Sequence, residues 1–312
     1  MIKRIILLLI ASFSLNLYAQ TDLLDLVEDK AEATTDYTTA TFKTTKIVSG
    51  NSVETNGEGQ LNFVIQHRFG RVTSGINQFF GLDDANLRLA LEYGVLDNLD
   101  IGVGRSSYEK KLDFFVKYRF LRQSTGAKKM PITMAGFASM QIITGTLSSN
   151  PRQTDLFTSR MSFAYQLMIA RKFGKWVSVQ LTPTLVHKNF VYSSKDRNDI
   201  FSLGFGTSVR LSGSVRLNLE YYWTFEGQVV SPYNQEKVVN PISLGVDIET
   251  GGHVFQIHVS NSRGMLEKEM VAETTGDITK GQVNFGFNIT RSFALYDAKK
   301  LKQKMALKKE KI

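Results

Sequence analysis

The sequence predicts an all-β fold, an antiparallel up-and-down transmembrane β-barrel of about 12 strands. Three observations lead to this prediction: an export signal at the start, no apolar run long enough for a membrane-spanning helix, and a long region of strand-like alternation. A bilayer interior offers no water to hydrogen-bond the backbone, so a chain without such a helix can cross it only as a closed sheet.

The first 19 residues have the pattern of a secretory signal peptide. Lys3 and Arg4 precede an apolar run from Ile5 to Phe13, and Leu17-Tyr18-Ala19 ends on a small residue suited to cleavage. The run is shorter than the roughly 20 residues of a membrane-spanning helix. We therefore expect residues 1–19 to be removed during export to the outer membrane.

Residues 20–58 are predicted to form a periplasmic N-terminal leader outside the barrel. They open with TDLLDLVEDKAE, which fits a short acidic helix, and pass into a threonine-rich stretch from Thr34 to Thr45. The piece TFKTTKIV fits either an extra strand or an ordered linker, and the sequence does not decide between them.

Residues 59–293 have the alternation of barrel strands. Between Met161 and Ile169 every second residue is apolar or aromatic, while Ser162, Ala164 and Gln166 are small or polar. This period of two places one face toward lipid and the other toward the lumen. The pattern predicts twelve strands, at 59–68, 85–94, 98–105, 110–121, 131–144, 158–172, 176–188, 199–210, 214–227, 239–249, 252–261 and 281–291.

The connections between these strands alternate in length. Outer-membrane barrels have short periplasmic turns and long external loops, so we expect the longer loops outside. Two links fit poorly, since 106–109 is a short external connection and 122–130 a long internal one. Short turns are predicted near 95–98, 173–175, 211–213 and 250–251, and longer loops at 69–84, 145–157, 189–198, 228–238 and 262–280.

A soluble β-sandwich or lipocalin-like barrel is the alternative fold. Polar and charged residues alternate with apolar ones on nearly every predicted strand, which favours a membrane barrel with a polar lumen. Aromatic residues also lie toward the strand ends, as in the girdles of a membrane interface, and include Phe63, Tyr93, Phe120, Trp176, Tyr221 and Trp223.

The same alternation directs many charged side chains into the lumen. Charges of both signs in a low-dielectric interior should pair, because an unpaired one costs several kcal/mol. Two interpretations stay open: a structural plug of salt bridges, and a charged constriction that selects solutes. The lumen-lining candidates are Arg68, Arg88, Glu92, Asp113, Lys117, Arg119, Arg210, Arg216, Glu220, Asp247, Glu249 and His258.

One fragment has residues suited to catalysis. His258-Val259-Ser260-Asn261 resembles the H-x-S-N stretch of outer-membrane phospholipase A, with His258 as base and Ser260 as nucleophile. Ser262 stands where that family has glycine, no third residue is evident, and alternation turns His258 and Ser260 toward the lumen. We therefore predict no catalytic residues. The four histidines lack metal-ligand spacing, so no metal site or cofactor is predicted either.

Charged segments also lie outside the strands. The chain has a formal net charge of +9, and residues 294–312 are predicted to form a basic periplasmic tail, either solvated or in contact with anionic lipid or a partner. Its lysines are Lys299, Lys300, Lys302, Lys304, Lys308, Lys309 and Lys311. The acidic residues of loop 262–280, Glu267, Glu269, Glu273 and Asp277, are expected to be solvated.

Four stretches resemble a known family of exported bacterial β-barrels, domain of unknown function 5777. They are HRFG at 67–70, FFGLDDANLRLALEYG at 79–94, IGVGRSSYEK at 101–110 and FVKYRFLRQSTG at 115–126. The resemblance is dense from Thr41 to Gly126 and extends loosely through the last strand. It implies an outer-membrane barrel and carries no activity or ligand.

These observations leave three functions open. The first is a narrow channel or transporter for small polar or charged solutes. The second is a structural or interaction barrel with an occluded lumen, whose loops or basic tail bind a partner. The third is an outer-membrane lipid hydrolase. Expected partners are outer-membrane lipid, the barrel assembly machinery during insertion and a small polar solute; nucleic acid is not expected, and the barrel is expected to be a monomer.

Overall fold

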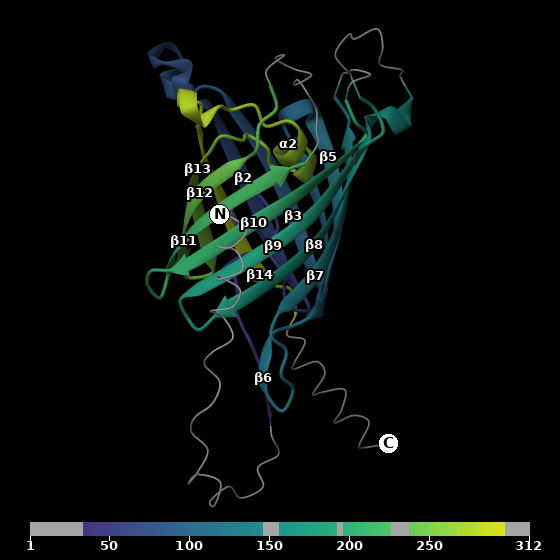
Figure 1. The fold of residues 1–312 in the computed structure, drawn as a ribbon, viewed down its shortest axis with the longest axis vertical. Coiled ribbons are helices and arrows are strands. Elements are labelled where there is room, and N and C mark those ends of the chain that lie inside the picture. Colours follow the sequence, from purple (N-terminus) through teal and green to yellow (C-terminus); the bar gives the residue numbers. More distant parts are fainter. Residues whose placement is uncertain (1–33, 146–155, 192–195, 226–236, 297–312) are drawn as a thin grey trace, which may run out of the picture.

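A computed structural model describes residues 34–145, 156–191, 196–225 and 237–296 of this chain. Within them, twelve strands close into one antiparallel barrel (Figure 1). They are β2 (Gln60–Arg71), β3 (Ala85–Leu96), β4 (Leu99–Ser106), β5 (Lys111–Leu121), β7 (Thr133–Ile143), β8 (Met161–Phe173), β9 (Val177–Lys188), β10 (Asp199–Arg210), β11 (Val215–Thr224), β12 (Ile242–Thr250), β13 (His253–Ser260) and β14 (Asn284–Ala294). The predicted fold class and strand number are confirmed.

The barrel strands pair in chain order, and β14 pairs with β2 to close the ring. Closure leaves no strand edge of the ring without a partner, as a lipid environment requires. The predicted strand boundaries lie within a few residues of the observed ones. The largest displacement is in the last strand, which was predicted at 281–291 and runs from Asn284 to Ala294.

The alternation seen in the sequence separates the two faces of each strand. On β3, the side chains of Leu87, Leu89 and Leu91 point outward and are 36%, 40% and 44% exposed, whereas the intervening Arg88 and Ala90 are buried. This arrangement gives the barrel an apolar outer surface and a polar interior, the reverse of a soluble barrel with an apolar core.

The longer connections gather at one end of the barrel. This end carries the 3₁₀ helices η1 (Val72–Ser74), η2 (Ile76–Gly81), η3 (Tyr108–Lys110), η4 (Phe157–Arg160) and η5 (Ile278–Lys280), and the helix α2 (Glu267–Ala272). Figure 1 shows α2 inside the upper part of the barrel. We call it the loop end, and the opposite end, with the short turns, the turn end.

The two links that fit the length rule poorly both have local explanations. The short connection before β5 is possible because Glu109 and Lys110 adopt positive φ angles of 53° and 48°, which turn the chain sharply. The long connection after β5 contains a further strand, β6 (Ser124–Gly126), which pairs with β1 (Thr35–Tyr37). This two-stranded sheet projects from the turn end (Figure 1).

Several predicted segments lie outside the described residues. They are the signal peptide of residues 1–19, the acidic start of the leader and nearly all of the basic tail from residue 297 onward. Among the described residues, no helix is both long and apolar enough to cross a membrane.

A charge on the lipid-facing surface should destabilise the barrel. Leu91 lies midway along β3 with its side chain outward, so Leu91→Arg should lower the free energy of unfolding by about 2–4 kcal/mol. The measurement is denaturant unfolding of the protein refolded into phospholipid vesicles, followed by tryptophan fluorescence. Leu211→Arg in the β10–β11 turn, where Leu211 is 57% exposed, is the control and should cost about 0–1 kcal/mol. Equal losses would contradict a membrane-embedded β3.

Candidate functional site in the barrel lumen

The first feature of the lumen is a segment that was expected to lie outside the barrel. Residues 41–56, here called the N-terminal insert, lie inside it, and every residue from 44 to 53 is buried. The insert is a hairpin: the Ile47 N–H donates to the Gly50 carbonyl (2.9 Å), and the Ser52 N–H donates to the Thr45 carbonyl (3.0 Å). The prediction that the leader lies outside the barrel is therefore wrong for residues 41–56. The piece TFKTTKIV, residues 41–48, is not an extra strand and forms the first part of this hairpin.

Glu220 on β11 binds the turn of this hairpin. Its carboxylate accepts hydrogen bonds from the backbone N–H groups of Val48 (3.0 Å), Ser49 (3.2 Å) and Gly50 (2.8 Å). Gly50 also has to be glycine here, because a Cβ would collide with the Tyr222 hydroxyl. A single wall carboxylate thus satisfies three buried backbone donors.

Lys117 on β5 binds the two arms of the hairpin from the opposite wall. The ammonium group donates to the carbonyls of Thr45 (3.1 Å), Ser52 (3.1 Å) and Glu54 (3.2 Å). Amide side chains complete the pattern: Gln256 donates to the Ile47 carbonyl (3.1 Å) and Asn288 to the Val48 carbonyl (2.8 Å). The inner wall therefore recognises the main chain of the insert with groups of matching polarity.

Apolar side chains of the insert pack on one side of the lumen. Phe42, Ile47, Val48 and Val53 form a buried cluster with wall residues Ala135, Phe137, Met168 and Ala170. The insert is consequently held by both apolar packing and hydrogen bonds.

The second feature is residues 262–276, here called the loop insert, which enters from the loop end. Its helix α2 is buried along its whole length. Glu267 and Glu269 are 3% and 5% exposed, and the side chain of Glu273 is 6% exposed. The expectation that these acidic residues are solvated is therefore wrong for all three; Asp277, just beyond the insert, has a 33% exposed side chain.

The two inserts meet inside the barrel at Glu267. Its carboxylate accepts a hydrogen bond from the Asn51 side chain (2.9 Å) and forms an ion pair with Lys46 (3.5 Å), both from the N-terminal insert. Ser139 on β7 donates to the same carboxylate (3.2 Å). Segments from opposite ends of the barrel are thus joined through one side chain.

The remaining acids of the loop insert are paired with lysines. Lys111 on β5 forms ion pairs with Glu269 (2.8 Å) and Glu109 (2.6 Å), and Lys268 pairs with Glu273 (2.8 Å). Burial alone would raise the pKa of the Glu273 carboxyl, but Lys268 and Lys111 bring this pKa below its ordinary value. Glu273 is therefore ionised at neutral pH.

Most predicted lumen residues do point inward, although few pair with each other. Buried inside the barrel are Arg68, Arg88, Glu92, Asp113, Lys117, Arg216, Glu220, Asp247 and His258. Half-buried near the turn end are Arg119, Arg210 and Glu249. The wall pair Arg88–Asp113 is bidentate, with N···O distances of 3.0 and 2.5 Å, but most of the other charged groups bind the inserts.

Arg68 departs from the expectation that buried charges pair. It is 0% exposed, yet its partners are neutral: Asn288 (2.9 Å), Ser49 (3.3 Å) and the carbonyls of His67 (3.0 Å) and Phe287 (3.3 Å). Lys111 was not among the predicted lumen residues, although it has the same parity on β5 as Asp113 and Lys117 and is equally buried. Alternation could have identified it.

The phospholipase-like fragment does not form a nucleophile–base pair. The Ser260 hydroxyl accepts from the Ser243 hydroxyl (2.8 Å) and donates to the Ile242 carbonyl (3.1 Å), whereas neither ring nitrogen of His258 has a hydrogen-bond partner in the described chain. Both residues face the lumen, as predicted. Within the same residues, no three His, Asp or Glu side chains are grouped as metal ligands would be.

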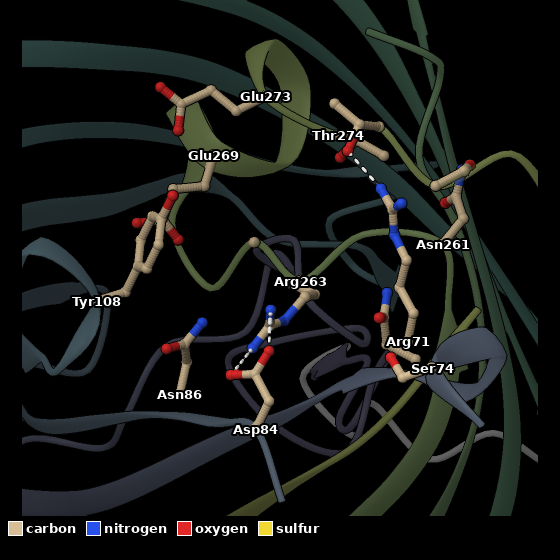
Figure 2. Close-up of a pocket in the computed structure, with 14 residues that line it drawn as sticks. Arg71, Ser74, Asp84, Asn86, Tyr108, Asn261, Arg263, Glu269, Glu273 and Thr274 are labelled. Carbon is tan, nitrogen blue, oxygen red and sulfur yellow. Dashed lines mark hydrogen bonds and ion pairs between the residues drawn. The ribbon is translucent and has the colours of Figure 1, made fainter. Parts of the chain in front are cut away.

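A cavity of about 350 Å³ lies beside the loop insert, at the loop end of the barrel. We call it the outer pocket. It lies between the β2–β3 rim and the loop insert, and Figure 2 shows side chains from both directed into it. Its charged lining consists of Arg71, Asp84, Arg263, Glu269 and Glu273, with Tyr108 beside Glu269.

The comparison with protein families decides the membership of this chain. The model of a family described as a membrane-bound β-barrel domain, domain of unknown function 5777, matches residues 42–293. The chain belongs to this family. The match begins within the N-terminal insert, so both inserts are part of the family's domain. A comparison with curated proteins found no match.

Several solved structures are similar to this chain at low sequence identity. The NanC porin shares 10% identity, with 75% of this chain and 98% of that chain covered and a TM-score of 0.46. A COG4313 outer-membrane channel from Pseudomonas putida F1 shares 13%, with coverage of 77% and 98% and a TM-score of 0.46. An active-site mutant of outer-membrane phospholipase A from Escherichia coli shares 11%, with coverage of 78% and 93% and a TM-score of 0.39.

Removing the Glu220 carboxylate should loosen the hairpin turn. Glu220→Ala leaves three backbone donors at residues 48–50 without their acceptor, and each hydrogen bond to a charged group contributes about 1.5–3 kcal/mol. Hydrogen exchange at these amides should accelerate by about tenfold or more, while β11 amides stay protected. Glu249→Ala, which removes the contact to Lys43 at the rim of the same insert, should leave exchange at residues 48–50 unchanged. Unaltered exchange in Glu220→Ala would contradict the anchoring role.

Proposed function

We propose that this protein is an outer-membrane channel for small polar or charged solutes, closed at rest by the two inserts. The export signal and the grouping of long loops at one end support the outer membrane, with the turn end in the periplasm. The observation that carries the channel proposal is that polar groups attach both inserts to the lumen wall. Glu220 and Lys117 hold the N-terminal insert, and Ser139 holds Glu267 of the loop insert.

A permanent plug would be held more simply by apolar residues. Replacing buried ionic groups by well-packed apolar ones is often neutral or stabilising, whereas the lumen here is lined with charged groups and amides. Each of these groups can be solvated by water when an insert moves away. A lumen of this kind is stable both when it is filled by the inserts and when it is wet.

The N-terminal insert can leave without breaking the barrel. It contributes no strand to the ring, and both of its flanks lie at the turn end. On one side the Thr38 N–H donates to the Gln123 carbonyl (2.8 Å), and on the other the Gly59 N–H donates to the Gly94 carbonyl (2.9 Å). Withdrawal toward the periplasm would break side-chain contacts and leave the sheet hydrogen bonds intact.

The second candidate is an interaction barrel whose lumen stays closed. The entry of the two inserts into the lumen from opposite ends favours it, because Glu267 binds both the N-terminal insert, at Asn51 and Lys46, and the wall, at Ser139. On this proposal the loops or the basic tail of residues 294–312 would bind a partner, and no solute would pass.

An engineered disulfide separates the two candidates. A Cβ on Gly245 would lie 3.3 Å from Val48 Cγ2, close to the geometry of a disulfide, and the chain has no cysteine of its own. In a planar bilayer, the Val48→Cys/Gly245→Cys variant should lose channel openings to the background level when oxidised and recover them on reduction. The unmodified protein should open intermittently under both conditions.

The single variant Val48→Cys is the matched control, because it carries the oxidisable thiol without a partner. Openings that persist in the oxidised double variant would show that the N-terminal insert is not the gate. Electrical silence in the unmodified protein and in Glu220→Ala alike would favour the interaction barrel over the channel.

A further inference from the structure

The outer pocket is the described cavity that opens toward the loop end, and the function proposed above does not explain its composition. Its lining carries charges of both signs: two guanidinium groups and three carboxylates. A plain anion bound there would face the carboxylates, and a plain cation would face the guanidinium groups. The composition therefore points to a ligand that carries both charges.

Asp84 and Arg263 pair with each other, and the remaining charged side chains lie on opposite sides of the cavity. Figure 2 shows Arg71 on one side, next to Ser74 and Asn261, and Glu269, Glu273 and Tyr108 together on the other. The Arg71 guanidinium donates to the Thr275 hydroxyl (2.8 Å), which orients it at this side. A guanidinium suits a carboxylate because its fork of donors matches two oxygens.

Glu269 and Glu273 both line the pocket. Lys111 and Lys268, which pair with Glu269 and Glu273, are not part of the pocket lining. Glu269 also accepts from the Met265 N–H (3.0 Å). Each carboxylate has two oxygens with several acceptor positions, so these contacts leave capacity for a further donor. An ammonium group is such a donor.

Polar atoms without partners lie around the same cavity. Asn284 is 2% exposed and lines the pocket, and its side-chain oxygen has no hydrogen-bond partner in the described chain. The Nε–H of Arg263 is likewise without a partner there, although its terminal nitrogens bind Asp84 at 2.8 and 2.9 Å. A buried acceptor and a donor lacking partners are the groups that a small polar ligand would satisfy.

We propose that the outer pocket binds a small zwitterion, an amino acid or a dipeptide, with its carboxylate on Arg71 and its ammonium group toward Glu269 and Glu273. The volume of about 350 Å³ is within the range of small-molecule sites. This assignment rests on the proposed function for its role, since it names the solute class that would reach the channel from outside. Because the loop insert forms one wall, bound ligand would also contact the segment that closes the lumen.

Isothermal titration calorimetry of the folded protein in detergent tests the site, with glycylglycine as the probe. Binding in the millimolar range or tighter is expected. N-Acetylglycylglycine lacks the ammonium group and glycylglycinamide lacks the carboxylate, so each should bind about tenfold more weakly or worse. Equal binding of glycylglycine and either analogue, or no heat with any of the three, would overturn the proposal.

Variants assign the binding to this cavity. Arg71→Gln and Glu273→Gln should each weaken glycylglycine binding about tenfold. Arg291→Gln, on β14 near the turn end, where the side chain contacts His253, should bind like the unmodified protein. Heat-dependent migration on a denaturing gel verifies that each variant is a closed barrel. Unchanged binding in folded Arg71→Gln would overturn the assignment.

The proposed zwitterion site and the proposed channel can be rejected independently of each other. Glycylglycine binding that Arg71→Gln abolishes, in a protein that never conducts, would uphold the pocket and reject the channel. Conductance with no glycylglycine binding would uphold the channel and reject the pocket as a zwitterion site.

Discussion

The structure depends on hydrogen bonds from wall side chains to the backbone of the N-terminal insert. Irregular backbone at the depth of a membrane is tolerated only where protein or water satisfies its polar groups. Glu220 supplies an acceptor for three N–H groups, and Lys117 supplies donors for three carbonyls. Without these partners, a hairpin in the lumen would leave several buried donors and acceptors unpaired, at a cost of about 1–3 kcal/mol each.

The same constraint explains the composition of the lumen. Arg88 and Asp113 neutralise each other within the wall, but Glu220, Lys117 and Arg68 hydrogen-bond the N-terminal insert. Charges that alternation directs inward serve here as a binding surface for the chain's own segment. The loop insert follows the same rule from the other end, where Glu269 and Glu273 are paired with Lys111 and Lys268. Glu267 then joins both inserts, so a displacement of one insert would disturb its contacts with the other.

Prediction from sequence succeeded for the direction of the strand side chains, because each strand determines that direction by itself. The side chains of Leu87, Leu89 and Leu91 face outward and that of Arg88 faces inward because the pleat alternates with period two, whatever the neighbouring strands are. Prediction failed for residues 41–56 and for Glu267 and Glu269, which have no such period. Their burial depends on partners as distant in the chain as Asn288, which binds the Val48 carbonyl. A threonine-rich or acidic segment has the same sequence pattern whether it is solvated or held by a polar wall.

The sequence by itself determined the membrane barrel, its twelve strands, the inward direction of its charged side chains and the end at which the long loops gather. These features follow from local periodicity and loop length, which are properties of neighbouring residues. Only the tertiary structure decided that the lumen is filled, that Glu267 links the two inserts, and that Arg71 and Glu273 face one cavity. Each of these depends on which distant side chains closure of the ring brings together, and closure is a property of the whole sheet.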